Sequence, residues 1–235
     1  MEVFTILACC LLCIEASNKI SQYEKCSHKS LDSLNLTLES ESLFQCARQC
    51  SSIDLICKTF SYSSATNECS LGTCVTTKPT NDTNDNCVDI YVSSNVPKCD
   101  EVDGFTVMSY GLVNACVWFS NYTTNYDNAS KACISKGAIL YTVKQIEKLY
   151  ILQRFKEKYW IGLTYRVNEK LYRWSDGALF PNTSYWKDIF SSGEPNYPGY
   201  ENCVQYYIMG SQTLNDIICN TLLKYVCEIP CFVEK

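Results

Sequence analysis

Apolar positions recur along this chain with helical and with strand-like spacing, and the two patterns predict its secondary structure. Residues 142–155 (TVKQIEKLYILQRF) carry apolar side chains near helical spacing, which predicts a helix. A shorter helix is predicted for 126–136, followed by Gly137 as a normal C-terminal stop. The apolar runs 115–120 (ACVWFS) and 160–163 (WIGL) predict strands, the second of them buried.

The N-terminal half contains another helical segment. Residues 39–50 (ESESLFQCARQC) predict a helix that Ser40 or Ser42 caps at its N-terminus. Within it, Cys46 and Cys50 stand at i and i+4 and therefore share one face. Two cysteines on one face allow this helix to be linked to a neighbouring element.

A strand pair is predicted directly after this helix. Residues 57–63 (CKTFSYS) alternate as a strand does, and a turn around Asn67 leads to a partner strand that carries Cys69. The helix and the strand pair together predict a small domain of mixed helix and strand, stapled by disulfides.

Length and composition predict two domains. A polar stretch at 76–86 closes the first group of cysteines, and the segment SSNVP that ends at Pro97 is typical of an extended linker. The mature length suits two small domains. The predicted organisation is a signal peptide at 1–17, a first domain at 18–92, a linker at 93–98, a second domain at 99–229 and a tail at 230–235.

The beginning of the chain is typical of a cleaved secretory signal. Met1 to Ala16 contain the apolar run VFTILACCLLCI and end in small residues, and this run is too short to span a bilayer. No later segment approaches the length of a membrane span. We therefore expect a soluble, secreted, extracellular product without a membrane span.

Cysteine usage supports an oxidising compartment. The chain has 17 Cys, of which Cys9, Cys10 and Cys13 leave with the signal peptide. The even number that remains predicts a disulfide framework. Zinc is a poor alternative, because the mature chain has no Cys-x-x-Cys pair and His28 is its only imidazole.

The remaining composition excludes several classes of function. The net charge of −5 is spread along the chain and forms no basic stripe, so nucleic acid is not an expected partner. With one His and no nucleophile elbow, an enzyme is not expected either. Asn-x-Ser/Thr sequons fit a secreted glycoprotein and stand at Asn35, Asn81, Asn121, Asn128 and Asn182.

Oxygen-bearing side chains gather in three short strings near the C-terminal end. Carboxylate and amide oxygens are ligands that calcium takes in numbers of about six to eight. Their spacing fits neither one helix nor one strand, so loops must bring them together. The strings are Glu194-Pro195-Asn196, Glu201-Asn202-Cys203 and Leu214-Asn215-Asp216.

With these strings, residues 99–229 resemble the carbohydrate-recognition domain of C-type lectins. The resemblance implies an α+β, disulfide-stapled C-type lectin fold with two helices, small antiparallel sheets and a long loop region. Trp160, Trp174 and Trp186 are expected to be core residues rather than sugar platforms. Further matching motifs are Trp160-Ile161-Gly162-Leu163, Trp174-Ser175-Asp176-Gly177, Trp186 and Val226-Cys227-Glu228.

The resemblance also implies a cofactor and a ligand. Calcium (Ca²⁺) would bind two neighbouring sugar hydroxyls, with glutamates accepting and asparagines donating hydrogen bonds. The family uses Glu-Pro-Asn for equatorial vicinal hydroxyls, as in mannose, N-acetylglucosamine and fucose, and Gln-Pro-Asp for galactose. The bond before Pro195 is then expected to be cis. The implied metal and carbohydrate ligands are Glu194, Asn196, Glu201, Asn215 and Asp216.

Some positions depart from the family pattern. Leu214 stands where a tryptophan is usual and keeps an apolar wall. Tyr197 and Tyr200 could form an apolar platform beside the sugar. A second, auxiliary calcium site looks degraded, because Tyr165, Tyr197 and Asn202 replace acidic ligands and only Glu169 remains.

Disulfide pairings are likewise implied by resemblance. Residues 20–92 resemble the PAN/apple module, and 99–229 the lectin domain. One cysteine in each domain is left over, which leaves open either a Cys74–Cys231 bridge or disulfide-linked dimers. The implied pairs are Cys46–Cys69, Cys50–Cys57, Cys26–Cys87, Cys99–Cys116, Cys133–Cys227 and Cys203–Cys219.

The expected function is therefore a secreted, calcium-dependent lectin for mannose, N-acetylglucosamine or fucose-type glycans, and the resemblance suggests recognition of microbial or foreign surfaces. The alternative is a protein-binding or extracellular-matrix module that acts mainly through the PAN/apple-like domain. No collagen repeat or heptad neck is present, so the leftover cysteines or the first domain would have to supply any oligomer.

Overall fold

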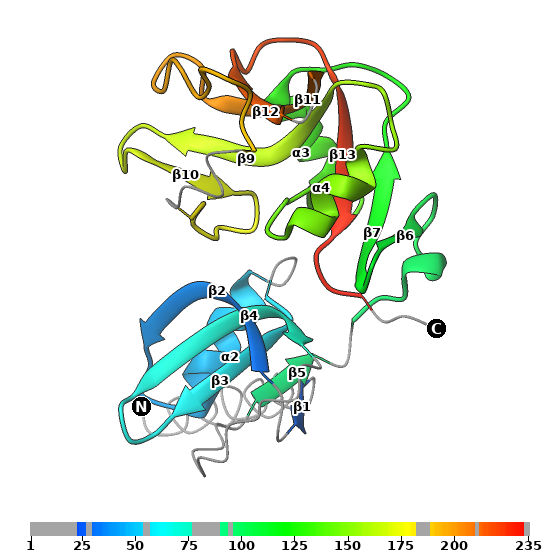
Figure 1. Cartoon of the computed structure of the whole chain (residues 1–235). Coiled ribbons are helices and arrows are strands. Elements are labelled where there is room, and N and C mark those ends of the chain that lie inside the picture. Colours follow the sequence, from blue (N-terminus) through cyan, green and yellow to red (C-terminus); the bar gives the residue numbers. More distant parts are fainter. Residues whose placement is uncertain are drawn as a thin grey trace, which may run out of the picture. The chain divides into compact units, whose positions relative to one another are not determined.

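The computed structural model describes residues 23–26, 30–53, 57–76, 90–93, 96–181, 189–209 and 212–232. The chain divides into two compact units, Met1–Val96 and Pro97–Lys235 (Figure 1). The division falls inside the segment expected to be a linker. Across the described ranges, every helix is too short or too polar to cross a membrane.

Among the described residues, the first unit packs helix α2 on an antiparallel sheet. The described strands are ordered β1-β5-β3-β4-β2 (Figure 1). Its core gathers around the cysteines of the helix, with Phe60 and Leu71 from the central strands. The elements are β1 (Tyr23–Cys26), β2 (Ser30–Glu39), α2 (Leu43–Ser52), β3 (Thr59–Ser63), β4 (Glu68–Thr76) and β5 (Ile90–Ser93).

Helix α2 begins four residues later than the sequence pattern predicts. Glu39 pairs with Glu68 in the β2–β4 ladder, so it cannot also be helical. Of the two caps expected from the sequence, Ser40 and Ser42, the structure has Ser42 as the N-cap. Its hydroxyl accepts a hydrogen bond from the Gln45 amide at 3.2 Å. The Gln45 side chain in turn accepts from the amide of Glu41, the residue before the N-cap, at 2.7 Å, an arrangement that resembles a capping box shifted by one residue.

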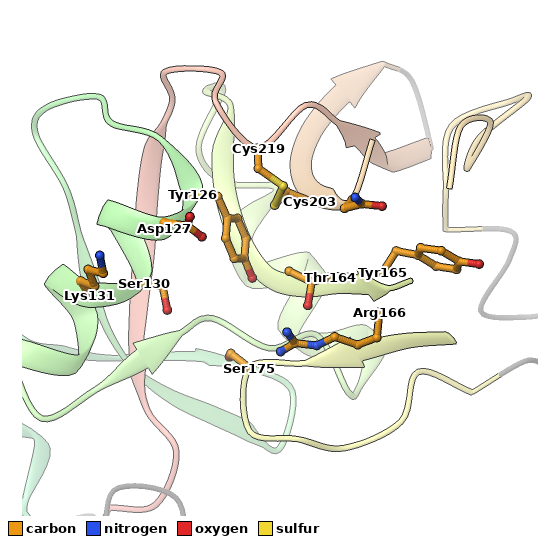
Figure 2. A pocket seen from close by; sticks show the side chains of 11 residues that line it. Tyr126, Asp127, Ser130, Lys131, Thr164, Tyr165, Arg166, Ser175, Cys203 and Cys219 are labelled. Atoms are coloured by element: carbon orange, nitrogen blue, oxygen red, sulfur yellow. A yellow bond between two sulfur atoms is a disulfide. The ribbon is translucent and has the colours of Figure 1, made fainter. Parts of the chain in front are cut away.

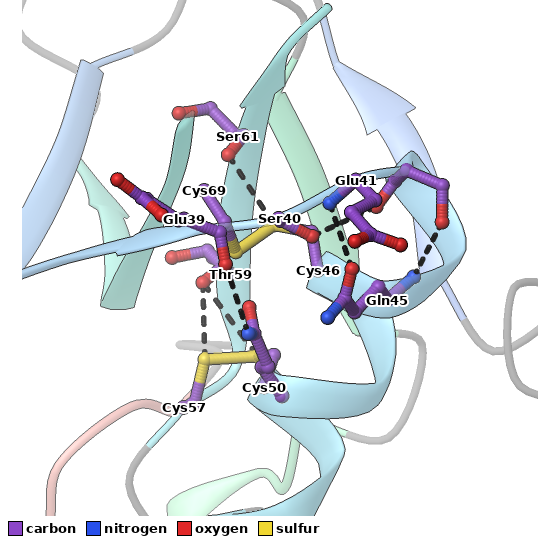
Figure 3. Close-up of a disulfide and its surroundings, with 12 residues drawn as sticks. Glu39, Ser40, Glu41, Gln45, Cys46, Cys50, Cys57, Thr59, Ser61 and Cys69 are labelled. Atoms are coloured by element: carbon purple, nitrogen blue, oxygen red, sulfur yellow. Dashed lines mark hydrogen bonds between the residues drawn. A yellow bond between two sulfur atoms is a disulfide. The ribbon is translucent and has the colours of Figure 1, made fainter. Parts of the chain in front are cut away.

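Two disulfides hold α2 against the sheet (Figure 3). Cys46 bonds to Cys69 on β4, and Cys50 bonds to Cys57 just before β3. All four cysteines are fully buried. The pairs are those that the sequence resemblance implies.

The second unit is a mixed structure with strands ordered β12-β11-β9-β13-β7-β6, in which β13 and β9 run parallel. Trp160 and Trp174 are buried in its core, as expected. Its elements are η1 (Cys99–Glu101), β6 (Thr106–Tyr110), β7 (Val113–Phe119), α3 (Tyr126–Ser135), β8 (Ile139–Leu140), α4 (Ile146–Leu152), β9 (Tyr159–Arg166), β10 (Leu171–Trp174), β11 (Cys203–Met209), β12 (Gln212–Ile217) and β13 (Lys224–Ile229).

Helix α4 is only half as long as its pattern of apolar residues predicts. The preceding segment stays extended because Tyr141 donates its amide to the Val226 carbonyl at 2.9 Å. The Thr142 amide and hydroxyl both donate to the Glu228 carboxylate, at 2.8 and 2.5 Å. Lys148 forms an ion pair with the same buried carboxylate, whose side chain is 3% exposed. Contacts with β13 therefore override the helical spacing of residues 142–145.

Replacing Thr142 with valine is expected to lower the free energy of unfolding by about 2 kcal/mol, because a buried carboxylate loses a donor. Urea denaturation followed by circular dichroism measures the change. The matched control is Thr106→Val on the exposed face of β6, for which less than about 0.5 kcal/mol is expected. Equal effects for the two variants would show that the Glu228 network adds nothing beyond local packing.

In the described part of the second unit, three disulfides have both partners placed: Cys99–Cys116, Cys133–Cys227 and Cys203–Cys219. They agree with the implied pairs. Cys231 is buried and is also disulfide-bonded. Its partner is not one of the ten cysteines in the pairs given above. Its pairing with Cys74 stays a prediction, as does Cys26–Cys87. Several residues of the sequence analysis lie outside the described ranges: His28, Asn81, Cys87, Asn182 and Trp186.

Candidate functional site

The five predicted oxygen ligands come from one loop and one strand of the second unit. We call them the oxygen cluster: Glu194, Asn196, Glu201, Asn215 and Asp216. The loop before β11 carries the first three, and β12 carries the last two. A parallel bridge between Phe190 and Leu214 joins the loop to β12, and the Ser191 amide donates to the Leu214 carbonyl at 2.8 Å.

Asp216 is the centre of the contacts within the oxygen cluster. Its side chain is almost fully buried, at 1% exposure. One carboxylate oxygen, Oδ1, accepts from the Asn196 amide at 3.2 Å, and Oδ2 lies 3.4 Å from the Tyr172 hydroxyl that donates to it. The Asn196 side-chain amide donates to Glu194 Oε1 at 3.0 Å. The peptide bond between Glu194 and Pro195 is cis, which confirms the expectation.

Burial and neighbouring charge raise the pKa of two acids of the oxygen cluster, Glu194 and Glu201. Burial raises the pKa of the Glu194 carboxyl to about 7, with further contributions from the adjacent Asp216 carboxylate and from the charge of Glu201. Burial also raises the pKa of Glu201, and the charge of Asp216 adds to this rise. Glu194 Oε2 is buried without a hydrogen-bond partner. The cluster therefore combines concentrated negative charge with an unsatisfied acceptor.

These features fit a hard cation better than a purely structural role. A cation would satisfy the buried Oε2 atom and would remove the repulsion that raises the carboxyl pKa values. Oxygen-only donors of this kind favour calcium or magnesium over transition metals. In the part of the chain described, no three His, Cys, Asp or Glu side chains could hold a metal by themselves. The amide oxygens of Asn196 and Asn215 would thus have to complete the coordination.

The loop that carries Glu201 is stabilised by its own hydrogen bonds. The Glu201 amide donates to the Tyr197 carbonyl at 2.8 Å. Asn202 accepts from the Gly199 amide at 2.9 Å and donates to the Gly199 carbonyl at 3.3 Å. Tyr197 and Tyr200 project from this loop with 63% and 71% of their surface exposed. The tyrosines are therefore accessible to a ligand beside the oxygen cluster.

The residues of the degraded auxiliary site have other partners. Glu169, the one remaining acid, binds Arg173 through Nε at 2.6 Å. The side chain of Asn202 is engaged with the Gly199 backbone. Leu214 is fully buried in the main core, so it keeps the apolar wall expected in place of tryptophan. Tyr165 packs its ring against Tyr172, with centroids 5.1 Å apart.

Sequence reasoning did not identify Tyr172. Burial and the neighbouring charge of Asp216 raise the pKa of the Tyr172 hydroxyl, so it serves as a hydrogen-bond donor to that carboxylate. No local motif marks this role, because Tyr172 lies on β10 while Asp216 lies on β12. The pairing of Tyr172 with Tyr165 across β9 and β10 is what places its ring on this face.

Comparison with known proteins assigns most of the second unit to one family. Residues 122–229 match the family model of the lectin C-type domain. CD209 antigen-like protein D of Mus musculus is 33% identical over 119 residues, or 48% of this chain and 47% of that protein. C-type lectin domain family 4 member M of Nomascus concolor is 32% identical over 126 residues, or 51% of this chain and 30% of that protein. The chain thus spans less than half of either relative.

Solved structures of similar domains include the trimeric Kupffer cell C-type lectin receptor Clec4f, with 28% identity and a TM-score of 0.43. The alignment covers 53% of this chain and 82% of that one. The carbohydrate-recognition domain of cow CD23 has 25% identity and a TM-score of 0.43, over 54% of this chain and 92% of that one.

Proposed function

We propose that the C-type lectin domain formed by residues 122–229 binds glycans through a calcium ion held by the oxygen cluster. Members of this family are generally non-enzymatic carbohydrate-binding proteins. The observation that carries the proposal is the group of mutually repelling acids with a buried, unpartnered oxygen on Glu194. Calcium, when bound, supplies open coordination positions that two neighbouring sugar hydroxyls fill.

Selectivity follows from the polar atoms on either side of the cation. Glu194 offers a carboxylate oxygen as acceptor, and the Asn196 amide offers hydrogens as donor. Glu201 and Asn215 provide the second acceptor and donor. This order of groups suits equatorial vicinal hydroxyls, so mannose, N-acetylglucosamine and fucose are the proposed sugars. The exposed rings of Tyr197 and Tyr200 can pack on an apolar face of the bound glycan.

The biological setting that we propose is secretion and recognition of microbial or foreign surfaces. One sugar held by two hydroxyls binds weakly, so tight surface binding requires several sites acting together. We assign the first unit, with its two helix-to-sheet disulfides, to a PAN/apple-like domain that can contribute a protein contact.

Affinity chromatography tests the proposed function directly. The secreted chain is expected to bind immobilised mannose in calcium and to elute with a chelator. Columns bearing N-acetylglucosamine and fucose test the other two sugars, and a galactose column serves as the reference. Failure to bind any of the first three in calcium would contradict the lectin proposal and favour a protein-binding role.

Exchanging Glu194→Gln and Asn196→Asp together is expected to reverse the sugar preference by about tenfold in favour of galactose, because the acceptor and the donor change places. The control exchanges Glu101→Gln and Asn114→Asp, which make the same chemical changes outside the oxygen cluster. Competition of free sugars for the mannose column measures the preference. An unchanged preference for mannose would rule out the roles assigned to Glu194 and Asn196.

A further inference from the structure

A hollow lies between helix α3 and strand β9, with a volume of about 420 Å³ (Figure 2). We call it the α3 pocket. The first turns of α3 form one wall, β9 forms the opposite wall, and the Cys203–Cys219 disulfide lies at its edge. This volume lies within the range of about 300–1,000 Å³ that is usual for small-molecule sites.

The α3 pocket and the Tyr172–Asp216 contact of the oxygen cluster lie on opposite faces of the sheet. Thr164 on β9 pairs with Cys203 on β11, and its neighbour Tyr165 pairs with Tyr172 on β10. Successive side chains of a strand point to opposite faces. Tyr172 reaches Asp216 on one face, so Thr164 and Cys203 belong to the other. A ligand that contacts Thr164 and Cys203 therefore needs no contact with the Asp216 carboxylate.

Positive charge exceeds negative charge around the α3 pocket. Lys131 and Arg166 contribute two cations, and Asp127 contributes one carboxylate, within a chain whose net charge is −5. In Figure 2, the Arg166 side chain extends along the pocket below the ring of Tyr126. Burial raises the pKa of the Tyr126 hydroxyl and the charge of Arg166 opposes this rise, which agrees with their proximity. The local charge favours an anion.

Hydroxyl groups complete the lining. Ser130 and Tyr126 on α3 and Thr164 on β9 surround the same space, so several neutral groups are available beside the two cations. Such groups suit a ligand that carries hydroxyls as well as one negative charge. A simple inorganic anion would use the cations and leave most of this lining without a partner.

Contacts of Tyr126 and Trp160 hold the walls of the α3 pocket in place. The Tyr126 ring meets the edge of Trp160 with centroids 5.4 Å apart, and the Tyr126 amide donates to the Cys219 carbonyl at 3.0 Å. Trp160 Nε1 donates to the Thr124 carbonyl at 2.9 Å. A pocket fixed in this way loses little conformational freedom on binding.

We propose that the α3 pocket binds a monoanionic sugar, either carboxylated or sulfated, without calcium. The anion lies between Arg166 and Lys131, and the sugar hydroxyls contact Ser130, Thr164 and Tyr126. The resulting domain has two sites with different requirements. Calcium-dependent binding uses the oxygen cluster, and calcium-independent binding uses the α3 pocket.

Titration of the full-length, ¹⁵N-labelled secreted chain in EDTA tests this proposal. The probes are glucuronic acid, N-acetylglucosamine 6-sulfate, neutral N-acetylglucosamine and inorganic sulfate. At least one charged sugar is expected to shift the amide signals of Ser130 and Thr164 and to leave those of Asn196 and Asn215 unchanged. Whichever charged sugar binds more tightly identifies the anionic group. Neutral sugar and inorganic sulfate are expected to bind at least about tenfold more weakly.

Variants distinguish binding in the α3 pocket from a general attraction of charged sugars to surface cations. Arg166→Ala and Lys131→Ala should each weaken charged-sugar binding about tenfold or more. Lys156 is an exposed cation that does not line the pocket, so Lys156→Ala should leave charged-sugar binding unchanged. Thermal unfolding verifies that each variant is folded. The proposal is overturned if neither charged sugar binds in EDTA, if Arg166→Ala binds as tightly as the unmodified chain, or if inorganic sulfate matches the sugars.

Discussion

Replacing Asp216 with asparagine is expected to weaken calcium binding by roughly 100-fold and to abolish retention on mannose. Asp216 is the most buried acid of the oxygen cluster, and both of its carboxylate oxygens contact neighbouring groups of the site. Asparagine keeps the shape and one acceptor for the Asn196 amide. The change therefore removes mainly the negative charge that a cation requires at this position.

Isothermal titration with calcium measures the change, and the matched control is Asp103→Asn, an exposed acid in the same unit. In chelator, Asp216→Asn should not lower the thermal midpoint, because it removes repulsion with Glu194. This second measurement distinguishes loss of a ligand from loss of the fold. Unchanged calcium affinity would exclude Asp216 as a metal ligand, and a large fall of the midpoint in chelator would assign it a structural role.

The secondary structure could be predicted where local signals and tertiary contacts agree. Helix α3 ends one residue before Lys136, close to the expected stop, and Asn67 adopts the left-handed conformation of the expected turn. The prediction was wrong for the start of α4, because the partner of Thr142 is Glu228, which is 86 residues away. A helical spacing cannot indicate such a partner, and propensity yields to tertiary contact there.

Some residues of the candidate site could likewise be predicted from the sequence, and others could not. Glu194 and Asn196 could be identified because a proline stands between them, and Asn215 and Asp216 because they follow each other. Tyr172 could not be identified, since only the pairing of β9 with β10 brings it to the cluster. The α3 pocket likewise had no sequence signal. Its cations lie on α3 and β9, and no motif connects them.

Calcium affinity is expected to fall about tenfold for each unit that the pH drops below 7, since calcium must displace a proton from Glu194. Burial and the neighbouring acids raise the pKa of Glu194 to about 7 when no cation is present. Calcium binding therefore releases a proton below that pH. Retention on mannose should follow the same curve, so mild acidification should elute the protein as a chelator does.

The thermal midpoint provides a second test, because the calcium-free and the calcium-bound protein are expected to respond to pH in opposite directions. Without calcium, the raised pKa of Glu194 contributes stability that is complete below the ordinary carboxyl pKa of about 4.3 and is lost as the pH rises through 7. With calcium in excess, stability should instead rise with pH over that range, because the ion binds only the folded, deprotonated cluster. Glu194→Gln removes the titrating group and should flatten both curves between about pH 5.5 and 7.5. Parallel curves with and without calcium would show that the cation binds without displacing a proton from Glu194, and the proposed coordination would be wrong.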